Sequence, residues 1–309
     1  MSKLAFVFPG QGSQAIGMLA DLAAQHAVIK TTFDEASAAL GLDLWALSQN
    51  GPEEDLNRTE NTQPVLLTAG VAVFRAWQAA GGATPDYLAG HSLGEYTALV
   101  ASGVLSLADG VRLVAERGRL MQLAVPQGEG AMAAILGLED DVVRQCCAEA
   151  AAAGVVEAVN FNAPGQVVIA GSTAAVTAAI EKLKAAGAKR ALPLPVSVPS
   201  HCALMKPAAE KLKVSLDAVS FNTPAIPVVQ NVAARIEADA AAMRAALIAQ
   251  LYSPVQWVQS VEALAGLGVS RALECGPGKV LCGLNKRIVK ELECASLENA
   301  ESFKQALGA

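Results

Sequence analysis

Aromatic, charged and histidine residues are scarce in this 309-residue sequence. Aromatic residues make up 4% of the chain and charged residues 17%, whereas 53% is hydrophobic. Acidic residues outnumber basic ones, and the formal net charge of −6 disfavours general binding to nucleic acid, whose phosphates require a basic surface. The large apolar fraction predicts an extensive buried core, in one large domain with an insertion or in two domains.

Long apolar runs and paired cysteine motifs are missing as well. No stretch reaches the roughly 18 unbroken apolar residues of a membrane-spanning helix, and the apolar N-terminal run stops at Pro9-Gly10, too early for a signal-peptide core. We therefore expect a cytoplasmic protein that does not bind membranes and whose cysteines are reduced, mostly buried thiols. No cluster of cysteine and histidine has zinc-ligand spacing, so no metal site is expected. The six cysteines are Cys146, Cys147, Cys202, Cys275, Cys282 and Cys294.

The clearest motif is Gly90-His91-Ser92-Leu93-Gly94, which follows a short strand-like run and precedes the helical pattern of residues 95–101. Gly-x-Ser-x-Gly between a strand and a helix is the nucleophile-elbow pattern, in which a sharp turn leaves no room for the flanking side chains. The turn would present the Ser92 hydroxyl at the helix N-terminus, whose free N–H groups favour a developing oxyanion. The alternative is an ordinary glycine-rich turn, because the bare motif also arises by chance.

Two interpretations compete for the loop at residues 9–14, which links the apolar strand Leu4–Phe8 to a helix expected to begin near Ala15. Its glycine spacing matches a permissive dinucleotide fingerprint, with an acidic residue about 20 positions further on. That acid should end a second strand, but the segment around it has helical spacing. The favoured alternative is that the N–H of Gln11 joins that of Leu93 as a pair of oxyanion donors, which is the usual arrangement around an elbow.

A basic residue interrupts the apolar face of a predicted helix. The run 106–109 resembles a capping box, and the helix that it opens extends to about Ala124. An unpaired buried charge costs several kcal/mol, so the Arg117 guanidinium needs an anion that its own face does not supply. Either Arg117 extends past its aliphatic stem to water or a distant carboxylate, or it binds a substrate carboxylate bidentately. The apolar face comprises Leu113, Arg117, Leu120, Met121 and Ala124, and the opposite face carries Arg112, Glu116 and Arg119.

From residue 126 to residue 197 strands and helices follow the order βαββαβ. This order is that of a ferredoxin-like module, so we predict an α/β protein whose catalytic domain comprises residues 1–125 and 198–309, with residues 126–197 as an inserted small subdomain. The predicted strands are Ala131–Leu136, Val155–Phe161, Gln166–Ala170 and Ala191–Val196, and the predicted helices are Asp140–Ala153 and Thr173–Ala186.

Three amide side chains are candidates for lining a pocket. Gln63 precedes an apolar helix expected over Val65–Trp77 and could reach a pocket, but capping of that helix is the favoured interpretation. Asn160 and Asn162 lie at the end of the second small-subdomain strand and in the turn after it, where they could face a cleft. For Asn162, turn formation is the favoured interpretation.

Among the three histidines, His201 is the candidate base for Ser92. It follows a predicted strand and a proline, on a loop where the main sheet resumes. His26 belongs to an early polar helix, and His91 adjoins Ser92 but points elsewhere, because successive side chains diverge. Further strands are expected at Val228–Val232 and Arg271–Cys275, with a helix at Met243–Tyr252 between them.

Taken together, these motifs resemble the malonyl-CoA:acyl carrier protein transacylases of bacterial fatty acid synthesis over nearly the whole chain. The resemblance implies an α/β-hydrolase-like core with a mainly parallel sheet and a ferredoxin-like insertion, in agreement with the element order above. One such motif would be weak evidence for the family, but many motifs at matching positions are strong evidence. They are residues 8–14, 90–96, Arg117-Gly118 with Met121, Ser200-His201, Gln250 with residues 254–257, and Gly276-Pro277-Gly278.

The resemblance also implies a role for each site residue. Ser92 would be the nucleophile and His201 its base, and the main-chain carbonyl of Gln250, in place of an aspartate, would orient the imidazole. The N–H groups of Gln11 and Leu93 would form the oxyanion hole, and Arg117 would hold the malonyl carboxylate. Candidate pocket-lining residues are Gln63, His91, Met121, Asn160, Asn162 and Ser200. Because related modules often carry Phe where Ser200 stands, selection against an α-methyl group is left open.

The implied reaction is a ping-pong transfer of malonyl from CoA to Ser92 and then to the phosphopantetheine thiol of acyl carrier protein. It needs no metal or organic cofactor, and we expect a monomer. The basic edge that includes Lys286 and Arg287 would dock the acidic carrier protein, or it is simply a solvated helix face. The competing functions are a serine esterase or thioesterase of the same fold, and a non-catalytic carrier-protein binder.

Overall fold

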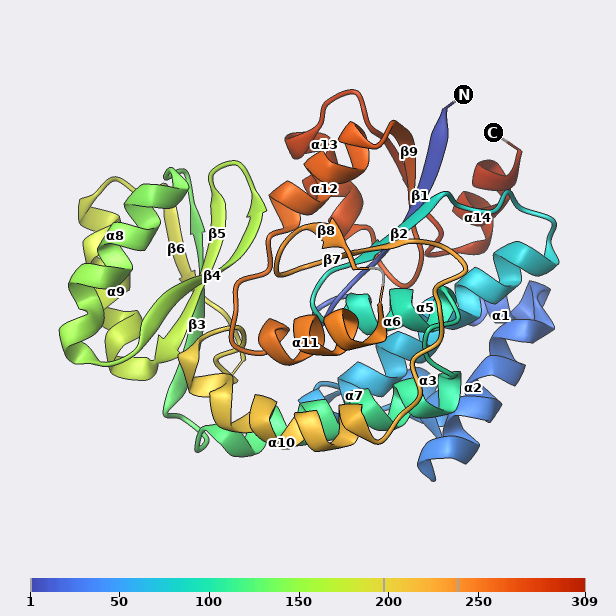
Figure 1. Ribbon diagram of the computed structural model, residues 1–309, viewed down its shortest axis with the longest axis horizontal. Coiled ribbons are helices and arrows are strands. Elements are labelled where there is room, and N and C mark those ends of the chain that lie inside the picture. The colour runs from blue at the N-terminus through green and yellow to red at the C-terminus, as the bar shows by residue number, and fades with distance from the viewer. Residues whose placement is uncertain (1, 197, 238, 309) are drawn as a thin grey trace.

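A computed structural model describes residues 2–196, 198–237 and 239–308, and it contains two β-sheets flanked by helices (Figure 1). The larger sheet has six strands in the order β10-β9-β1-β2-β7-β8, and the smaller has four in the order β4-β5-β3-β6. In the larger sheet only the β7–β8 pair is antiparallel, whereas every pair in the smaller sheet is antiparallel. The predicted fold class is thus confirmed.

The larger sheet is buried on both faces, as a parallel sheet must be. In its central strand β1 the side chains of Phe6 and Phe8 join one apolar cluster with helices α2, α5 and α7, while Ala5 and Val7 join another with α12 and α13. This alternation explains why the run reads as continuously apolar. The strands are β1 Lys3–Phe8, β2 Tyr87–Gly90, β7 Val228–Gln230, β8 Arg235–Ile236, β9 Val269–Glu274 and β10 Glu293–Ser296.

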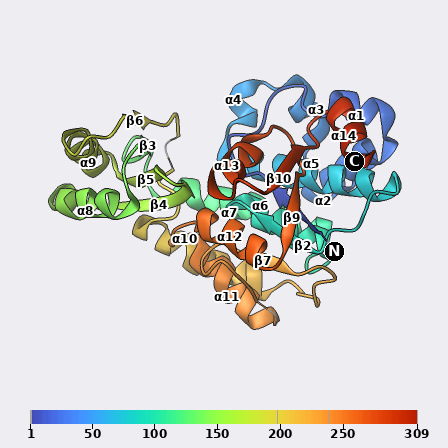
Figure 2. The same cartoon turned by 90° about the horizontal axis from the view of Figure 1, so that it is seen from above.

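Helices cover both faces of this sheet (Figures 1 and 2). Helix α5 is enclosed by other elements, and every residue from Thr62 to Phe74 is buried. The helices are α1 Ala20–Gln25, α2 Ala27–Leu40, α3 Leu44–Asn50, α4 Glu53–Leu56, α5 Thr59–Ala79, α6 Leu93–Ala101, α7 Leu107–Ala124, α10 Lys206–Asp217, α11 Ala240–Gln250, α12 Trp257–Gly266, α13 Val280–Ile288 and α14 Ala300–Leu307, with a 3-10 turn at Ala203–Met205. None of the helices in the described ranges is long and apolar enough to cross a membrane.

The smaller sheet and its two helices have the predicted βαββαβ order. Helices α8 and α9 pack on one face of the sheet, at the end of the molecule farthest from α1 and α14 (Figure 1). The domain limits expected at residues 125/126 and 197/198 stay a prediction, and residue 197 lies outside the described residues. The elements are β3 Gly130–Leu136, α8 Asp140–Ala150 with a 3-10 turn at Ala151–Ala153, β4 Val156–Ala163, β5 Gln166–Ser172, α9 Thr173–Ala185 and β6 Arg190–Pro193.

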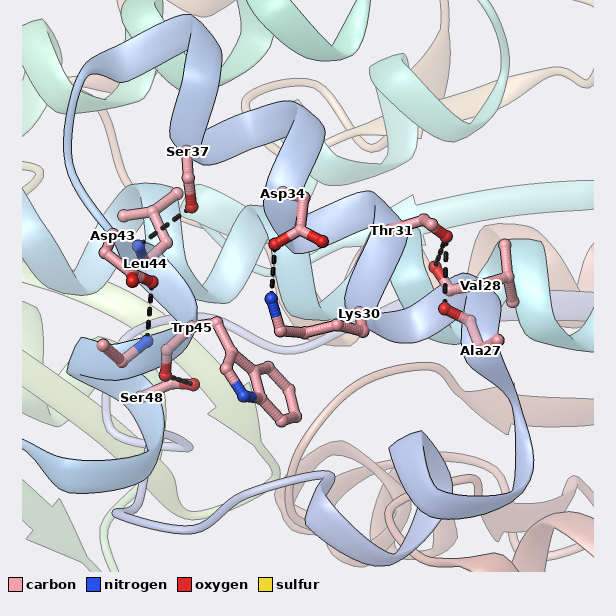
Figure 3. Close-up of polar contacts among 11 residues, drawn as sticks. Ala27, Val28, Lys30, Thr31, Asp34, Ser37, Asp43, Leu44, Trp45 and Ser48 are labelled. Carbon is pink, nitrogen blue, oxygen red and sulfur yellow. Dashed lines mark hydrogen bonds and ion pairs between the residues drawn. The ribbon is translucent and has the colours of Figure 1, made fainter.

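The position of two acids within α2 excludes the dinucleotide interpretation of the first loop. The acids at the required distance, Asp34 and Glu35, lie within α2 rather than at the end of a strand. Figure 3 shows Asp34 paired with Lys30 on the same helix, and Glu35 binds Arg75 at 2.6 Å.

The next helix, α3, is capped by Asp43, which accepts the N–H of Ala46 at 2.8 Å (Figure 3).

Two helix starts differ from the sequence expectation by five residues or more. Residues 16–19 form turns, with positive φ at Gly17 and Leu19, so the first helix begins at Ala20 and not near Ala15. Helix α5 begins at Thr59, because the Arg58 carbonyl already accepts the N–H groups of Asn61 and Thr62. Gln63 therefore lies inside this helix and does not cap it.

The cysteine expectation is wrong for one pair. Cys282 on α13 and Cys294 on β10 form a disulfide, because these neighbouring elements bring their Cα atoms to 5.2 Å. The sequence spacing of these two residues matches no familiar pairing motif, so only the packing of α13 on the sheet edge reveals it. The other four cysteines are free and buried, as expected.

Candidate active site

The turn between β2 and α6 has the geometry of a nucleophile elbow. Ser92 occupies it with φ 52° and ψ −107°, a strained conformation for a residue with a side chain. A Cβ at Gly90 would lie 1.9 Å from the carbonyl carbon of Gly94, and one at Gly94 would lie 2.1 Å from the Phe8 carbonyl oxygen. Only glycine fits at either position, so the motif glycines are required by the close approach of β2 and of β1 to α6.

Ser92, His201 and Gln250 form a hydrogen-bonded chain. The Ser92 Oγ lies 2.7 Å from His201 Nε2, and His201 Nδ1 lies 2.7 Å from the main-chain oxygen of Gln250. A carbonyl can only accept, so Nδ1 carries the proton and Nε2 is free to accept from the Ser92 hydroxyl. Burial, with the nearby positive charge of Arg117, lowers the pKa of His201 to about 3, so the imidazole is neutral near pH 7.

The Arg117 guanidinium faces Ser92 from inside the protein. Its Nη1 donates to Gln63 Oε1 at 2.8 Å, and its Nη2 donates to Ser92 Oγ at 3.2 Å and to Gln250 Oε1 at 3.0 Å. The residue is only 1% exposed, which rules out extension to bulk water. All three acceptors are neutral, so the positive charge is solvated by dipoles and the site retains affinity for an anion.

Gln63 and Asn162 have roles that differ from the favoured sequence interpretations. Gln63 contacts the site because its position in α5 faces α7, and its Nε2 lies 3.6 Å from Met121 Sδ. Asn162 belongs to β4, since Pro164-Gly165 alone make the turn to β5. Its Oδ1 lies 2.8 Å from His91 Nε2, which ties the small sheet to the elbow and turns His91 away from the Ser92 hydroxyl.

A cavity of about 140 Å³ opens beside Ser92, at the junction of the two sheets. The Asn160 Oδ1 is buried there without a hydrogen-bond partner, so it can accept one from a ligand. The lining residues are Gln11, Thr59, His91, Ser92, Leu93, Arg117, Met121, Met132, Asn160, Leu194, Val196, Val198, Ser200 and His201.

The first loop brings Gln11 to this cavity, next to Leu93. The His91 N–H donates to the Phe8 carbonyl at 3.0 Å, and a Cβ at Gly10 would lie 2.7 Å from the His91 carbonyl oxygen. The loop therefore lies directly against the elbow. Both residues that were expected to supply oxyanion donors thus line the same cavity as Ser92.

Two residues that support the elbow were not predicted from the sequence. The Asn231 side chain accepts the Ser92 N–H at 2.7 Å and donates to the Gly90 carbonyl at 2.7 Å. Its own N–H donates to Glu95 Oε2 at 2.9 Å. Asn231 directly follows β7, which pairs with β2, and a polar residue at the carboxyl end of a neighbouring parallel strand was the available signal.

Lys286 and Arg287 lie outside the cavity, on α13. Both residues are exposed. Arg287 also donates to the Pro164 carbonyl at 2.9 Å and to Gln166 Oε1. Arg287 therefore links α13 to the β4–β5 turn of the smaller sheet. Within the described part of the chain, no group of three or more His, Cys, Asp or Glu side chains could hold a metal ion.

The chain is similar to known proteins over nearly its whole length. The profile of the acyl transferase domain family matches residues 5–299. The malonyl CoA-acyl carrier protein transacylase of Escherichia coli K12 is 60% identical over 307 residues, 99% of each chain, and that of Bacillus subtilis 168 is 47% identical over 99% of this chain and 97% of its own.

Solved structures are similar to the chain as well. The malonyl-CoA:acyl carrier protein transacylase of Xanthomonas oryzae superposes with a TM-score of 0.98 at 58% identity, over 100% of this chain and 98% of that one. A malonyl-transacylase in complex with a type II PKS acyl-carrier protein also gives 0.98, at 56% identity over 99% of each chain.

Replacement of Asn231 by Ala should loosen the elbow. The variant leaves the Ser92 N–H and the Gly90 carbonyl buried without partners, so we expect the free energy of unfolding to fall by about 1–3 kcal/mol. Reaction of Ser92 with a fluorophosphonate should slow as well. Urea denaturation measures the first effect, and the time course of fluorophosphonate labelling measures the second. Asn222→Ala, which removes only one 3.4 Å side-chain bond near the surface, is the matched control, and equal effects of both variants would contradict the assignment.

Proposed function

The chain belongs to the acyl transferase family, and from the geometry around Ser92 we propose that it is an acyl carrier protein S-malonyltransferase. It moves malonyl from malonyl-CoA to the phosphopantetheine thiol of acyl carrier protein through a malonyl ester on Ser92. The observation that carries the proposal is the buried Arg117 guanidinium, 3.2 Å from the Ser92 hydroxyl. A cation at that distance from a nucleophile suits an acyl group with a second, anionic end.

In the first half-reaction Ser92 attacks the thioester carbon of malonyl-CoA. His201 Nε2 accepts the hydroxyl proton as the new C–O bond forms, and the carbonyl oxygen becomes an oxyanion. The N–H groups of Gln11 and Leu93 donate to that oxyanion. The C–S bond then breaks, and His201 returns the proton to the departing CoA sulfur. The products are the malonyl ester and free CoA.

The second half-reaction runs the same steps in reverse with a different thiol. The phosphopantetheine thiol of the carrier protein gives its proton to His201 Nε2, and its sulfur attacks the ester carbon. The oxyanion forms at the same two N–H groups, and collapse of the intermediate returns the proton to Ser92 Oγ. Malonyl leaves on the carrier protein, and the free serine is restored, which makes the kinetics ping-pong.

The main-chain oxygen of Gln250 takes the place that a carboxylate holds in a Ser-His-Asp triad. It holds the Nδ1–H tautomer of His201 but stabilises the imidazolium less than a charged group would. A low pKa for His201 is consistent with this neutral partner, because no carboxylate offsets the cost of burying the charged ring. The proton is therefore held by His201 only transiently, between serine and sulfur.

The cavity walls would hold the malonyl group. Arg117 binds its free carboxylate, with Gln63 and Gln250 holding the guanidinium in place. Met121 and Ser200 border the acyl group. The side from which the thioester enters is bordered by Asn160 and by His91, which Asn162 holds in place. The small Ser200 leaves space at a position where related modules often have Phe.

The reaction uses only side chains, main-chain N–H groups and the two substrates, so we propose no metal or organic cofactor. We further propose a cytoplasmic monomer that binds neither nucleic acid nor membranes, with residues 126–197 as a subdomain that closes one side of the cavity. Acyl carrier protein is the macromolecular partner, by analogy with the related malonyl-transacylase that was solved in complex with one.

Intact-mass analysis after exposure to malonyl-CoA tests the covalent step. We expect one malonyl group per chain, mapped to Ser92, and none on Ser92→Ala. Without carrier protein, CoA release should stop after a single-turnover burst. Steady CoA release would instead identify a thioesterase, and unimpaired function of Ser92→Ala would identify a non-catalytic carrier-protein binder.

Arg117→Ala tests the carboxylate site. Loss of a buried charged partner costs about 2–5 kcal/mol, so kcat/KM for malonyl-CoA should fall on the order of 100-fold. Acetyl-CoA has no second carboxylate and should be affected far less. Arg117→Lys keeps the charge but lacks the planar fork. Its kcat/KM for malonyl-CoA should lie between those of Arg117→Ala and the wild type. Comparable losses for malonyl and acetyl would remove Arg117 from this role.

We propose that the carrier protein docks on the basic edge of α13. Reversal of Lys286 and Arg287 to Glu should raise KM for the carrier protein and leave malonyl-CoA kinetics unchanged. Lys286→Glu alone is the cleaner variant, because Arg287 also holds the β4–β5 turn. Lys211→Glu on α10, which Figure 1 shows far from α13, is the control. An equal effect on both substrates would contradict this docking surface.

A further inference from the structure

Glu95 is a fully buried acid that faces the active site without touching the cavity. It lies in the first turn of α6, three residues after Ser92, and is 0% exposed. Its Oε2 accepts the Asn231 N–H and the Gln250 Nε2–H, each at 2.9 Å, while its Oε1 has no hydrogen-bond partner. A buried carboxylate with one unpaired oxygen is costly, so its position calls for an explanation.

The Gln250 amide connects this acid to Arg117. Its Nε2 donates to Glu95 Oε2 and, at 3.0 Å, to the Ser92 carbonyl, and its Oε1 accepts from Arg117 Nη2 at 3.0 Å. An ionised carboxylate can only accept and a guanidinium can only donate, so the amide has one permitted orientation between them. The same residue presents its main-chain oxygen to His201.

Glu95 is also the acid whose charge acts on Arg117. The direct acceptors around the guanidinium are neutral. Burial lowers the pKa of Arg117, and Tyr96 and then the charge of Glu95 oppose that lowering. Burial raises the pKa of Glu95 to about 7, against the opposing effects of Asn231, Gln250 and Arg117. Its charge is therefore sensitive to other charges placed near Arg117.

We propose that Glu95 is a positioning residue and the internal counter-charge of Arg117: through the Gln250 amide it orients the guanidinium, and its charge sets how strongly the site attracts the malonyl carboxylate. The inference rests on the proposed function. An ionised Glu95 disfavours a second carboxylate at Arg117, whereas a neutral Glu95 leaves the cation unbalanced and strengthens the attraction. By reciprocity, a bound malonyl group favours the protonated form of Glu95.

The charged and titratable groups around Glu95 make it the group that changes state near neutral pH. Arg117 on α7 stays cationic. Burial raises the pKa of Tyr96 on α6, which keeps the phenol neutral, and His201 on the loop before α10 is neutral because its pKa is about 3. His91, beyond His201, is also neutral because burial lowers its pKa. The preference for malonyl over acetyl should thus be higher at pH 6 than at pH 8.

The experiment compares Glu95→Gln and Glu95→Ala with the wild-type enzyme. Glutamine keeps an oxygen for the Asn231 and Gln250 donors and removes the charge. At pH 8 it should raise the ratio of kcat/KM for malonyl-CoA over acetyl-CoA on the order of fivefold, and the ratio should become flat between pH 6 and pH 8. Both substrates carry the same CoA phosphates, so titration of CoA cancels in the ratio.

Alanine removes the acceptor as well as the charge. The Gln250 amide then loses its anchor, so kcat should fall for both acyl groups, and its recovery in Glu95→Gln separates positioning from mere folding. Glu274→Gln is the matched control. This acid is also 0% exposed, and burial raises its pKa to about 7. Within the described residues its carboxylate accepts the main-chain N–H groups of Leu281 and Cys282 on α13 and bonds to neither Gln250 nor Arg117.

The control should leave the malonyl-to-acetyl ratio and its pH dependence as in the wild type. An unchanged ratio in Glu95→Gln, or a wild-type ratio that is flat from pH 6 to pH 8, would overturn the counter-charge. Equal shifts in Glu95→Gln and Glu274→Gln would overturn it too. A wild-type enzyme that takes no malonyl from malonyl-CoA would instead overturn the proposed function, so the two failures are distinguishable.

Discussion

A guanidinium held out of water beside a serine hydroxyl is the constraint on which the site depends. Arg117 is 1% exposed, and its hydrogen bonds go to two glutamine oxygens and the Ser92 hydroxyl. The acid Glu95 is connected to it only through the Gln250 amide. Dipoles of this kind keep a buried cation tolerable but leave it short of a full counter-ion. The site therefore favours an anionic acyl group. Helices α5 and α11, which supply the glutamine dipoles, must stay in fixed positions relative to α7 and the elbow.

The two sheets meet where this site needs a wall. Strand β4 of the smaller sheet contacts the loop before α12, where the Phe161 N–H donates to the Val255 carbonyl at 3.0 Å and the Val255 N–H donates to Val159 at 2.9 Å. Asn162, the residue after Phe161 in β4, hydrogen-bonds to His91. Because these links are short and partly buried, the smaller sheet closes the cavity over the carboxyl ends of the parallel strands, where α/β folds place their ligands.

Local patterns were predicted well where neighbours in sequence are neighbours in space. The elbow follows from two positions where a Cβ would clash with the neighbouring backbone. The α7 cap follows from Ser106, which accepts the Asp109 N–H. The βαββαβ order follows from alternating strand and helix periods. Gln63 and Asn162 were misinterpreted because helix α5 and strand β4 extend further than their apolar patterns. A helix start depends on which carbonyl accepts first, and that depends on packing.

The sequence by itself determined the fold class, the strand-turn-helix at Ser92 and the presence of an arginine on an apolar helix face. These features follow from periodicity and steric limits within a few residues. Only the tertiary structure decided what surrounds them: the 2.7 Å contact of His201 with Ser92, the Gln250 amide between Arg117 and Glu95, and the Asn231 clamp on the elbow. Those partners lie more than 100 positions apart in sequence, and hydrogen bonds across such separations exist only once the packed core has fixed both ends.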